Sequence, residues 1–167
     1  MSALTGLTEL WLCCNKFSSS VPSQISVLTR LTGLSLEYNS LVGSIAPQLA
    51  SLTGLQELFL GGNRLSGTFP LYFSTFTALT RLRLEGNKLV GSLPSQLSRL
   101  TKLYDLQLSL NSLSSSIPVE FSLLTGLTSL GLDQVGLIGS LPSQLSTLTG
   151  LSVLAISSNK LSGKGFK

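Results

Sequence analysis

A single 24-residue unit recurs along the whole chain, and its clearest copy is LTRLRLEGNKLVGSLPSQLSRLTK at Leu79–Lys102. The copies follow one another without insertion, and they begin at Leu7, Leu31, Leu55, Leu79, Leu103, Leu127 and Leu151. A partial repeat over residues 1–6 precedes them, and an irregular tail over residues 164–167 follows. A fixed period between about 20 and 50 residues is the signature of a solenoid. We therefore predict that residues 1–167 form one domain of about seven stacked coils.

Each coil is expected to contain one strand and one short helical turn. The apolar Leu82 and Leu84 alternate with charged residues, and such period-two alternation is typical of a strand with one buried face. We expect Leu79, Leu82 and Leu84 to point into the core, and equivalent strands of successive copies to pair in parallel. The second half of the unit, Pro94–Leu100, predicts a short α- or 3₁₀-helical turn, because proline suits the start of such a turn. The sequence thus predicts an α/β solenoid in which each coil contributes one strand of a parallel sheet and one short helical turn.

Asparagine recurs at one position of the unit. The members of this column are Asn15, Asn39, Asn63, Asn87, Asn111 and Asn159. A buried turn must satisfy its backbone N–H and C=O groups, and a side-chain amide both donates and accepts. We therefore assign the column a structural role in joining neighbouring turns. Val135 is the exception, and we expect the sixth copy to be locally loosened there.

Composition excludes several classes of function. Hydrophobic residues make up 43% of the chain and charged residues 11%, which favours a sizeable core over disorder. No apolar run approaches the ~18 residues of a membrane helix, so no membrane insertion is expected. The net charge of +4 is a mild excess, and the Lys and Arg residues form no basic run, so the sequence does not predict nucleic-acid binding. The adjacent Cys13 and Cys14 are not expected to form a disulfide framework.

Enzymatic chemistry is not indicated. The chain contains no histidine, which is the commonest general base and metal ligand. No phosphate-binding glycine loop and no nucleophile elbow occurs in the sequence. We therefore expect neither catalysis nor a metal or other cofactor.

The pattern LxxLxLxxNxLxGxIPxxLxxLxx resembles leucine-rich repeat proteins of the plant type, and Leu79–Lys102 matches it at nearly every fixed position. The recurring LTGL junction, as at Leu52–Leu55, is similar to versions found in protist surface proteins. This resemblance implies a right-handed, curved solenoid with the parallel sheet on its concave side, and a short second set of strands and 3₁₀ turns on the other, convex faces. It also implies an extracellular or cell-surface location, and the binding of proteins, peptides or glycans rather than catalysis.

The outward positions of the predicted strands decide what such a sheet could recognise. Six of the seven acidic residues lie at these positions, but only two of the eleven basic residues do. The sheet is therefore expected to be acidic with a basic centre at Arg81 and Arg83. Exposed aromatic residues beside charges are typical of binding hot spots. The predicted ligand-binding residues are Trp11, Glu37, Glu57, Phe59, Arg81, Arg83, Glu85, Asp105 and Asp133.

Our first hypothesis is a recognition module for a protein or peptide ligand whose charges complement this face, positive at its flanks and acidic at its centre. The alternative for the same residues is that Glu57, Arg81 and Asp105 simply neutralise one another across adjacent strands.

Two hypotheses of other classes remain open. The first is a structural protein that self-associates through exposed repeat ends. The second, weaker one is a hydroxyl face that binds ice or a glycan. Two hydroxyl columns motivate it, Thr5, Thr29, Thr53, Thr77, Thr101, Thr125 and Thr149, and Ser20, Ser44, Thr68, Ser92, Ser116 and Ser140. For both columns we favour the simpler interpretation, in which the hydroxyls tie backbone turns to one another.

Overall fold

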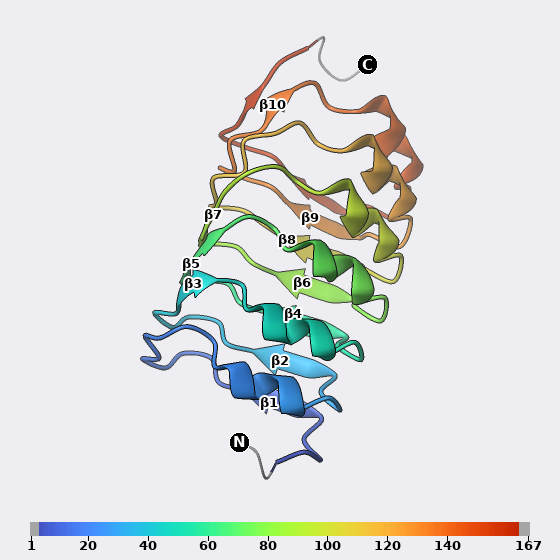
Figure 1. The fold of residues 1–167 in the computed structure, drawn as a ribbon. Helices are drawn as coiled ribbons and strands as arrows, with labels where there is room; N and C mark the ends of the chain where they lie inside the picture. Colours follow the sequence, from blue (N-terminus) through green and yellow to red (C-terminus); the bar gives the residue numbers. More distant parts are fainter. Residues whose placement is uncertain (1–3, 164–167) are drawn as a thin grey trace.

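Seven short parallel strands, one from each repeat, form the main sheet of the computed structural model, which describes residues 4–163 (Figure 1). The strands are β1 (Glu9–Trp11), β2 (Gly33–Ser35), β4 (Glu57–Phe59), β6 (Arg81–Arg83), β8 (Asp105–Gln107), β9 (Ser129–Gly131) and β11 (Val153–Ala155). They pair in chain order, and each residue pairs with the residue 24 positions further on, as Leu58 does with Leu82. The repeat period and the sheet register are therefore the same.

Within residues 4–163, six 3₁₀ helices lie on the opposite side of the solenoid from the main sheet (Figure 1). They are η1 (Ser23–Val27), η2 (Pro47–Ser51), η3 (Leu71–Thr75), η4 (Ser95–Arg99), η5 (Val119–Leu123) and η6 (Ser143–Thr147). In the fourth repeat, Pro94 stands just before the helix with extended backbone angles, and the N–H of Leu100 closes the helix on the carbonyl of Leu97. The predicted helical turn is thus a 3₁₀ helix of five residues.

A further set of short strands, here called the outer strands, connects the main sheet to the 3₁₀ helices. They are β3 (Val42–Ser44), β5 (Arg64–Gly67), β7 (Lys88–Leu89), β10 (Ile138–Gly139) and β12 (Lys160–Leu161). They pair with an offset of 22 residues rather than 24, so that Val42 lies beside Arg64 and Ser66 beside Lys88. Equivalent residues of the outer strands are therefore displaced along the strand from one repeat to the next.

Leucine fills the interior between these elements. Leu79, Leu82 and Leu84 are completely buried, as predicted, and so are their equivalents in most repeats. Phe73, Phe76 and Phe121 replace leucine in the third and fifth repeats without leaving the core. Burial of a leucine or phenylalanine side chain contributes about 1.5–3 kcal/mol, so this continuous column accounts for the cohesion of the stack. The predicted tail over residues 164–167 and the first three residues of the partial repeat lie outside the described part of the chain.

The asparagine column joins neighbouring repeats. The side-chain amide of Asn87 donates to the carbonyl of Leu60 in the preceding repeat at 3.0 Å and to that of Leu84 in its own repeat at 3.0 Å. Its oxygen accepts from the backbone N–H of Leu65 at 3.0 Å. The same set of bonds is made by Asn39, Asn63, Asn111 and Asn159. These hydrogen bonds join each of these asparagines to the preceding repeat, whereas the bonds of Asn15 among the described residues lie within its own turn.

At Val135 the backbone turn is retained, but the hydrogen bonds that an asparagine side chain would make are lost. Its side chain is completely buried, and Gln134 before it has the same positive φ as the residue before each asparagine. Asn159 of the next repeat accepts from the N–H groups of Val135, Gly136 and Leu137. The outer strands are interrupted at this point, since β10 pairs with β12 and not with β7. The predicted loosening of the sixth repeat stays a prediction.

Candidate functional site

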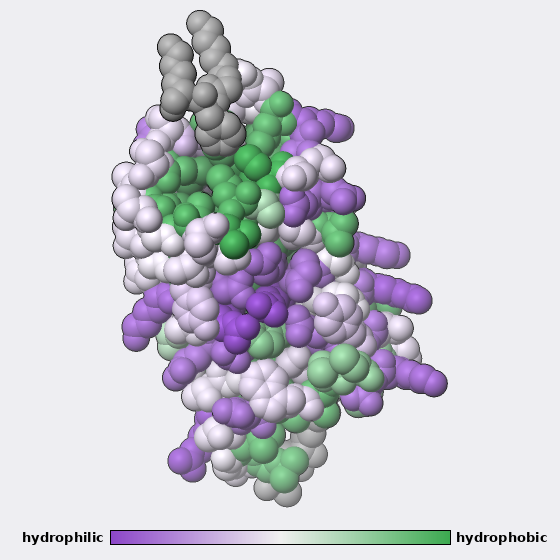
Figure 2. Space-filling view, turned by 180° about the vertical axis from the view of Figure 1, so that it is seen from behind, coloured by the Kyte–Doolittle hydropathy of each residue, from purple (hydrophilic) through white to green (hydrophobic). Residues whose placement is uncertain are grey.

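Five of the nine predicted ligand-binding residues form one network at the middle of the main sheet, which we call the central cluster: Glu57, Phe59, Arg81, Arg83 and Asp105. They lie on three adjacent strands, β4, β6 and β8, whose register places Arg81 between Glu57 and Asp105. Arg81 pairs with Glu57 at 3.1 Å and approaches Asp105 at 3.7 Å, and Arg83 pairs with Asp105 at 2.9 Å. Figure 2 shows the resulting hydrophilic patch in the middle of this face.

Phe59 forms the floor of the central cluster. Its ring is only 8% exposed, because the guanidinium groups of Arg81 and Arg83 lie 4.9 and 5.3 Å from its centre. A cation over an aromatic face contributes about 0.5–2 kcal/mol. The ion pairs of Arg81 with Glu57 and Asp105 match the alternative interpretation, in which these residues neutralise one another across adjacent strands. Arg81 and Arg83 lie at the centre of the sheet, but both are engaged by carboxylates and by the ring beneath them, so a ligand with an acidic centre has no unpaired cation to meet.

Trp11 remains available at the N-terminal end of the sheet. Its indole is 46% exposed, its ring centre lies 6.0 Å from that of Phe59, and its N–H donates to Glu9 at 3.0 Å. The indole reaches Phe59 across Gly33, where a Cβ atom would lie 2.9 Å from the ring. Glycine at position 33 therefore allows the indole to lie flat against the sheet.

Glu37 and Glu85 lie on either side of Gly61 and, together with Glu9 and Asp133, carry the unbalanced charge of this face among the described residues. The carboxylate of Glu85 folds over Gly61, where a Cβ atom would lie 2.9 Å from its carboxyl carbon. Its Oε2 atom is buried and has no hydrogen-bond partner among the described residues. Burial raises the pKa of Glu85, and Asp105 raises it further, against the opposing effects of its own backbone N–H and of Arg83. The pKa of Glu37 is also raised by burial and by Glu85, while Arg83 and Arg81 oppose the rise.

The remaining predicted residue, Asp133, does not join this group. Its carboxylate accepts from the backbone N–H of Ser157, which fixes the edge of the sheet. Sequence reasoning did not select Gln107, whose amide donates to Asp105 at 2.7 Å and to Ser129 at 2.9 Å and so extends the central cluster. It also did not select Tyr38, which is 60% exposed and lies over Gly62. The sequence did indicate both residues, since Gln107 occupies an outward strand position and Tyr38 lies at the margin of the same face.

The two hydroxyl columns do not make the hydrogen bonds between backbone turns that we expected. All members of both columns are exposed, and within residues 4–163 none of their hydroxyls takes part in a hydrogen bond. A third column makes hydrogen bonds of this kind. The hydroxyls of Thr32, Thr80, Thr128 and Ser152 each donate to the backbone carbonyl 24 residues earlier. That interpretation is therefore wrong, because a different hydroxyl satisfies the backbone.

Metal and redox features are sparse in the described residues. No group of three or more acidic or cysteine side chains within residues 4–163 could hold a metal ion. Cys13 and Cys14 are both exposed and free. Between residues 4 and 163, no helix has the length and apolar character that a membrane span requires.

Comparisons with known proteins agree with this architecture. Leucine-rich repeat family models match residues 5–65 and residues 78–100. A comparison with curated proteins gives no match. This chain belongs to the leucine-rich repeat proteins, in their plant-type form.

Solved structures with this fold include the leucine-rich repeat ectodomain of the plant membrane receptor kinase GASSHO1/SCHENGEN3 from Arabidopsis thaliana, in complex with CASPARIAN STRIP INTEGRITY FACTOR 2. It is 38% identical with a TM-score of 0.93, over 96% of this chain and 19% of that one. The plant peptide hormone receptor RGFR1, in complex with RGF2, is 34% identical with a TM-score of 0.92, over 96% of this chain and 26% of that one. The chain therefore spans about a fifth to a quarter of the length of these receptor ectodomains.

A plant ice-binding protein is a more distant structural neighbour. It is 26% identical with a TM-score of 0.71, over 97% of this chain and 67% of that one. The shared fold thus occurs in proteins with different ligands.

Proposed function

We propose that this chain is an extracellular recognition module that binds a basic segment of a protein or peptide on its main sheet. The observation that carries the proposal is the charge balance of that face. Arg81 and Arg83 are engaged within the central cluster, whereas Glu37 and Glu85 remain without a direct ion pair among the described residues. A lysine or arginine of the ligand would supply the missing counter-charge, which favours basic over acidic partners.

Trp11 supports the same proposal. A half-exposed indole beside the carboxylates offers a flat apolar surface, and interface energy is concentrated in such aromatic anchors. Figure 2 also shows a hydrophobic region between the hydrophilic middle of this face and its C-terminal end. A ligand chain that crosses the strands would therefore meet apolar, acidic and again apolar surface. The neighbouring receptor ectodomains, which form complexes with CASPARIAN STRIP INTEGRITY FACTOR 2 and RGF2, are consistent with this type of ligand.

The test is a selection of peptides from a random phage-displayed library on the purified protein. We expect the selected peptides to be enriched in Lys or Arg together with an aromatic or aliphatic residue. Glu37→Gln or Glu85→Gln should each weaken their binding about tenfold, as the loss of a charge-assisted contact does. Glu120→Gln, which removes the one acidic residue outside this face, is the matched control and should bind normally. Selection of acidic peptides, or equal losses in all three variants, would refute the proposal.

A second candidate function is ice binding. The observations that favour it are the two exposed hydroxyl columns, whose members recur once per repeat, and the plant ice-binding protein among the structural neighbours. Thermal hysteresis of the purified protein, lost on substitution of Thr77 and Thr101 by lysine, is the expected result for this candidate. Absence of hysteresis in the unmodified protein would reject it. Self-association through the repeat ends finds no support among these neighbours.

A further inference from the structure

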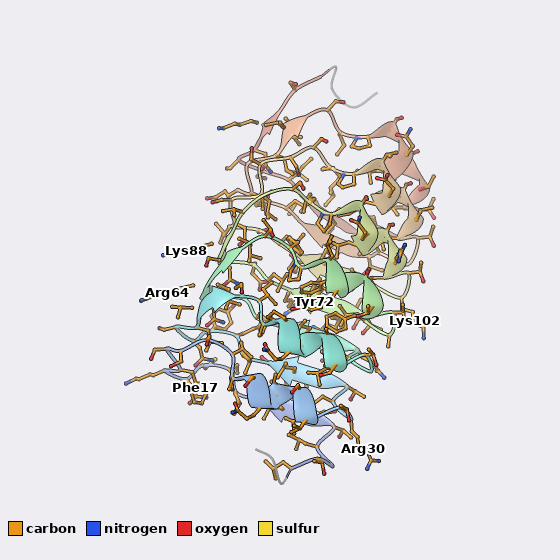
Figure 3. The ribbon with its side chains drawn as sticks, in the orientation of Figure 1. Phe17, Arg30, Arg64, Tyr72, Lys88 and Lys102 are labelled. Carbon is orange, nitrogen blue, oxygen red and sulfur yellow. The ribbon has the colours of Figure 1, made fainter. Side chains whose placement is uncertain are left out.

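A row of cations follows one edge of the solenoid, away from the main sheet. Its members, here called the cation row, share one repeat position: Lys16, Arg64, Lys88 and Lys160. All four side chains are exposed, and the salt bridges of the described residues all belong to the central cluster. Arg64 and Lys88 point outward from this edge in Figure 3, and Figure 2 shows long hydrophilic side chains projecting in a row from it. Like charges in such a row repel one another, so the row has counter-charge only when something else supplies it.

At Lys88, hydroxyl groups continue the row across the outer strands, whereas Arg64 lies beside Val42 and Lys160 beside Ile138. The register of β5 and β7 places Ser66 beside Lys88, and that of β3 and β5 places Ser44 beside Ser66. Neighbouring strands lie about 4.8 Å apart, so one cation and two hydroxyls form a line of about 10 Å. Where the outer strands end, a hollow of about 640 Å³ has Thr68, Ser92 and Ser116 in its lining. Around Lys88, this edge therefore presents a cation at one end of the strands and hydroxyls beyond it, and exposed apolar side chains at Val42 and Ile138 lie beside the other cations.

We propose that this edge binds an acidic polysaccharide, a linear chain of sugars that carry carboxylate groups. The cation row would pair with the carboxylates, and the serine and threonine hydroxyls would exchange hydrogen bonds with the hydroxyls of the sugar rings. The surface is separate from the main sheet, so the inference goes beyond the function proposed above. The chain would thus hold a carbohydrate matrix with one face and a ligand with another.

The spacing of the charges favours a polysaccharide over a nucleic acid. The offset of 22 residues moves equivalent side chains two residues along and one strand across, so Arg64 and Lys88 lie roughly 8 Å apart. Two and three repeats separate the other members of the row. Duplex DNA carries one charge per about 1.7 Å, which four such widely spaced cations cannot match. Single strands are bound through stacking on aromatic side chains, and β3, β5 and β7 carry none.

The test measures binding of polygalacturonate at about 0.15 M ionic strength, where charges on the opposite edge are screened, with fully methyl-esterified pectin as the uncharged comparison. We expect binding to polygalacturonate only, and a loss of at least about tenfold in the double variant Arg64→Glu/Lys88→Glu. The matched control is Arg30→Glu/Lys102→Glu, which makes the same change in net charge at two exposed positions on the opposite edge (Figure 3). The control should retain binding within about twofold. Because all four side chains are exposed, both double variants should keep the melting temperature of the parent.

Three outcomes would overturn the proposal. The first is an equal loss in the two double variants, which would show only a general attraction to net positive charge. The second is equal binding of the esterified polymer, and the third is tighter binding of single-stranded poly(dT) than of polygalacturonate. Trp11→Ala should leave polygalacturonate binding unchanged, so failure of this proposal is distinguishable from failure of the main-sheet function.

Discussion

Replacement of Asn87 by valine would place in the fourth repeat the residue that the sixth repeat carries naturally. The change removes the oxygen that accepts from the N–H of Leu65, and Leu65 is completely buried. A buried donor left without a partner costs about 1–3 kcal/mol. The two backbone carbonyls that accept from the Asn87 amide each keep another hydrogen bond. The carbonyl of Leu84 still accepts from the amide of Asn111, and the carbonyl of Leu60 from the amide of Asn63.

We therefore expect N87V to lower the free energy of unfolding by about 1–3 kcal/mol. For a domain of this size, a loss of 2 kcal/mol lowers the melting temperature by roughly 4–8 °C. Urea unfolding followed by circular dichroism, together with a thermal scan, measures both quantities. A melting temperature unchanged within error would refute the reasoning, because the amide would then contribute nothing that valine does not.

The reverse substitution, Val135→Asn, is the matched control. It offers an acceptor to the N–H of Leu113, which occupies the position that Leu65 holds two repeats earlier. Substitution of a fully buried valine by a polar residue ordinarily destabilises a protein by at least about 1 kcal/mol. Here the new hydrogen bonds offset that cost, so we expect stability to be unchanged or slightly raised. A loss as large as that of N87V would show that repeat six has adapted to valine.

The remaining predictions concern the main sheet. Gly33→Ala should displace the indole of Trp11 from Phe59, because the added Cβ would lie 2.9 Å from the indole ring. We expect a shifted tryptophan fluorescence maximum and weaker peptide binding. An unchanged fluorescence spectrum would contradict this prediction. Glu37 and Glu85 have raised pKa values in the folded state. Between the ordinary glutamate pKa and these raised values, the folded state therefore binds more protons than the unfolded state. The free energy of unfolding consequently falls as pH rises through this window. The difference in stability between Glu85→Gln and the wild type should therefore grow with pH across that window, and a pH-independent difference in urea titrations would exclude it. Over the same window, basic peptides should bind more tightly as pH rises, because the carboxyl groups become charged.

The repeat unit predicts most of the fold because each of its fixed positions has one physical task. Leu82 must be buried, Asn87 must satisfy a turn, and Pro94 must precede a helical turn. The leucine recurs in all seven copies, the asparagine in six and the proline in five, and together they define the stack. The offset of 22 residues in the outer strands could not be predicted in this way. It depends on how far the coils shift against one another, and no single residue of the unit encodes that displacement.

The candidate site was predicted as a set of positions but not as an arrangement of charges. The repeat pattern assigned Arg81 and Asp105 to outward strand positions, and the two residues do lie side by side on one face of the main sheet. The sequence could not show that both arginines fold over Phe59, because side-chain direction on an open sheet depends on three neighbouring strands at once. The hydroxyl columns illustrate the same limit: two positions carry hydroxyls with equal regularity, yet a third, at Thr80 and its equivalents, makes the bonds to the backbone.

The most direct test of ligand recognition by the main sheet is a nuclear magnetic resonance titration of the ¹⁵N-labelled protein with a selected basic peptide. We predict that the amide shifts concentrate in β1, β2, β4 and β6, with the indole N–H of Trp11 among the largest. Shifts confined to the 3₁₀ helices or the outer strands would contradict the account, because the ligand would then bind a face that the charge balance does not favour.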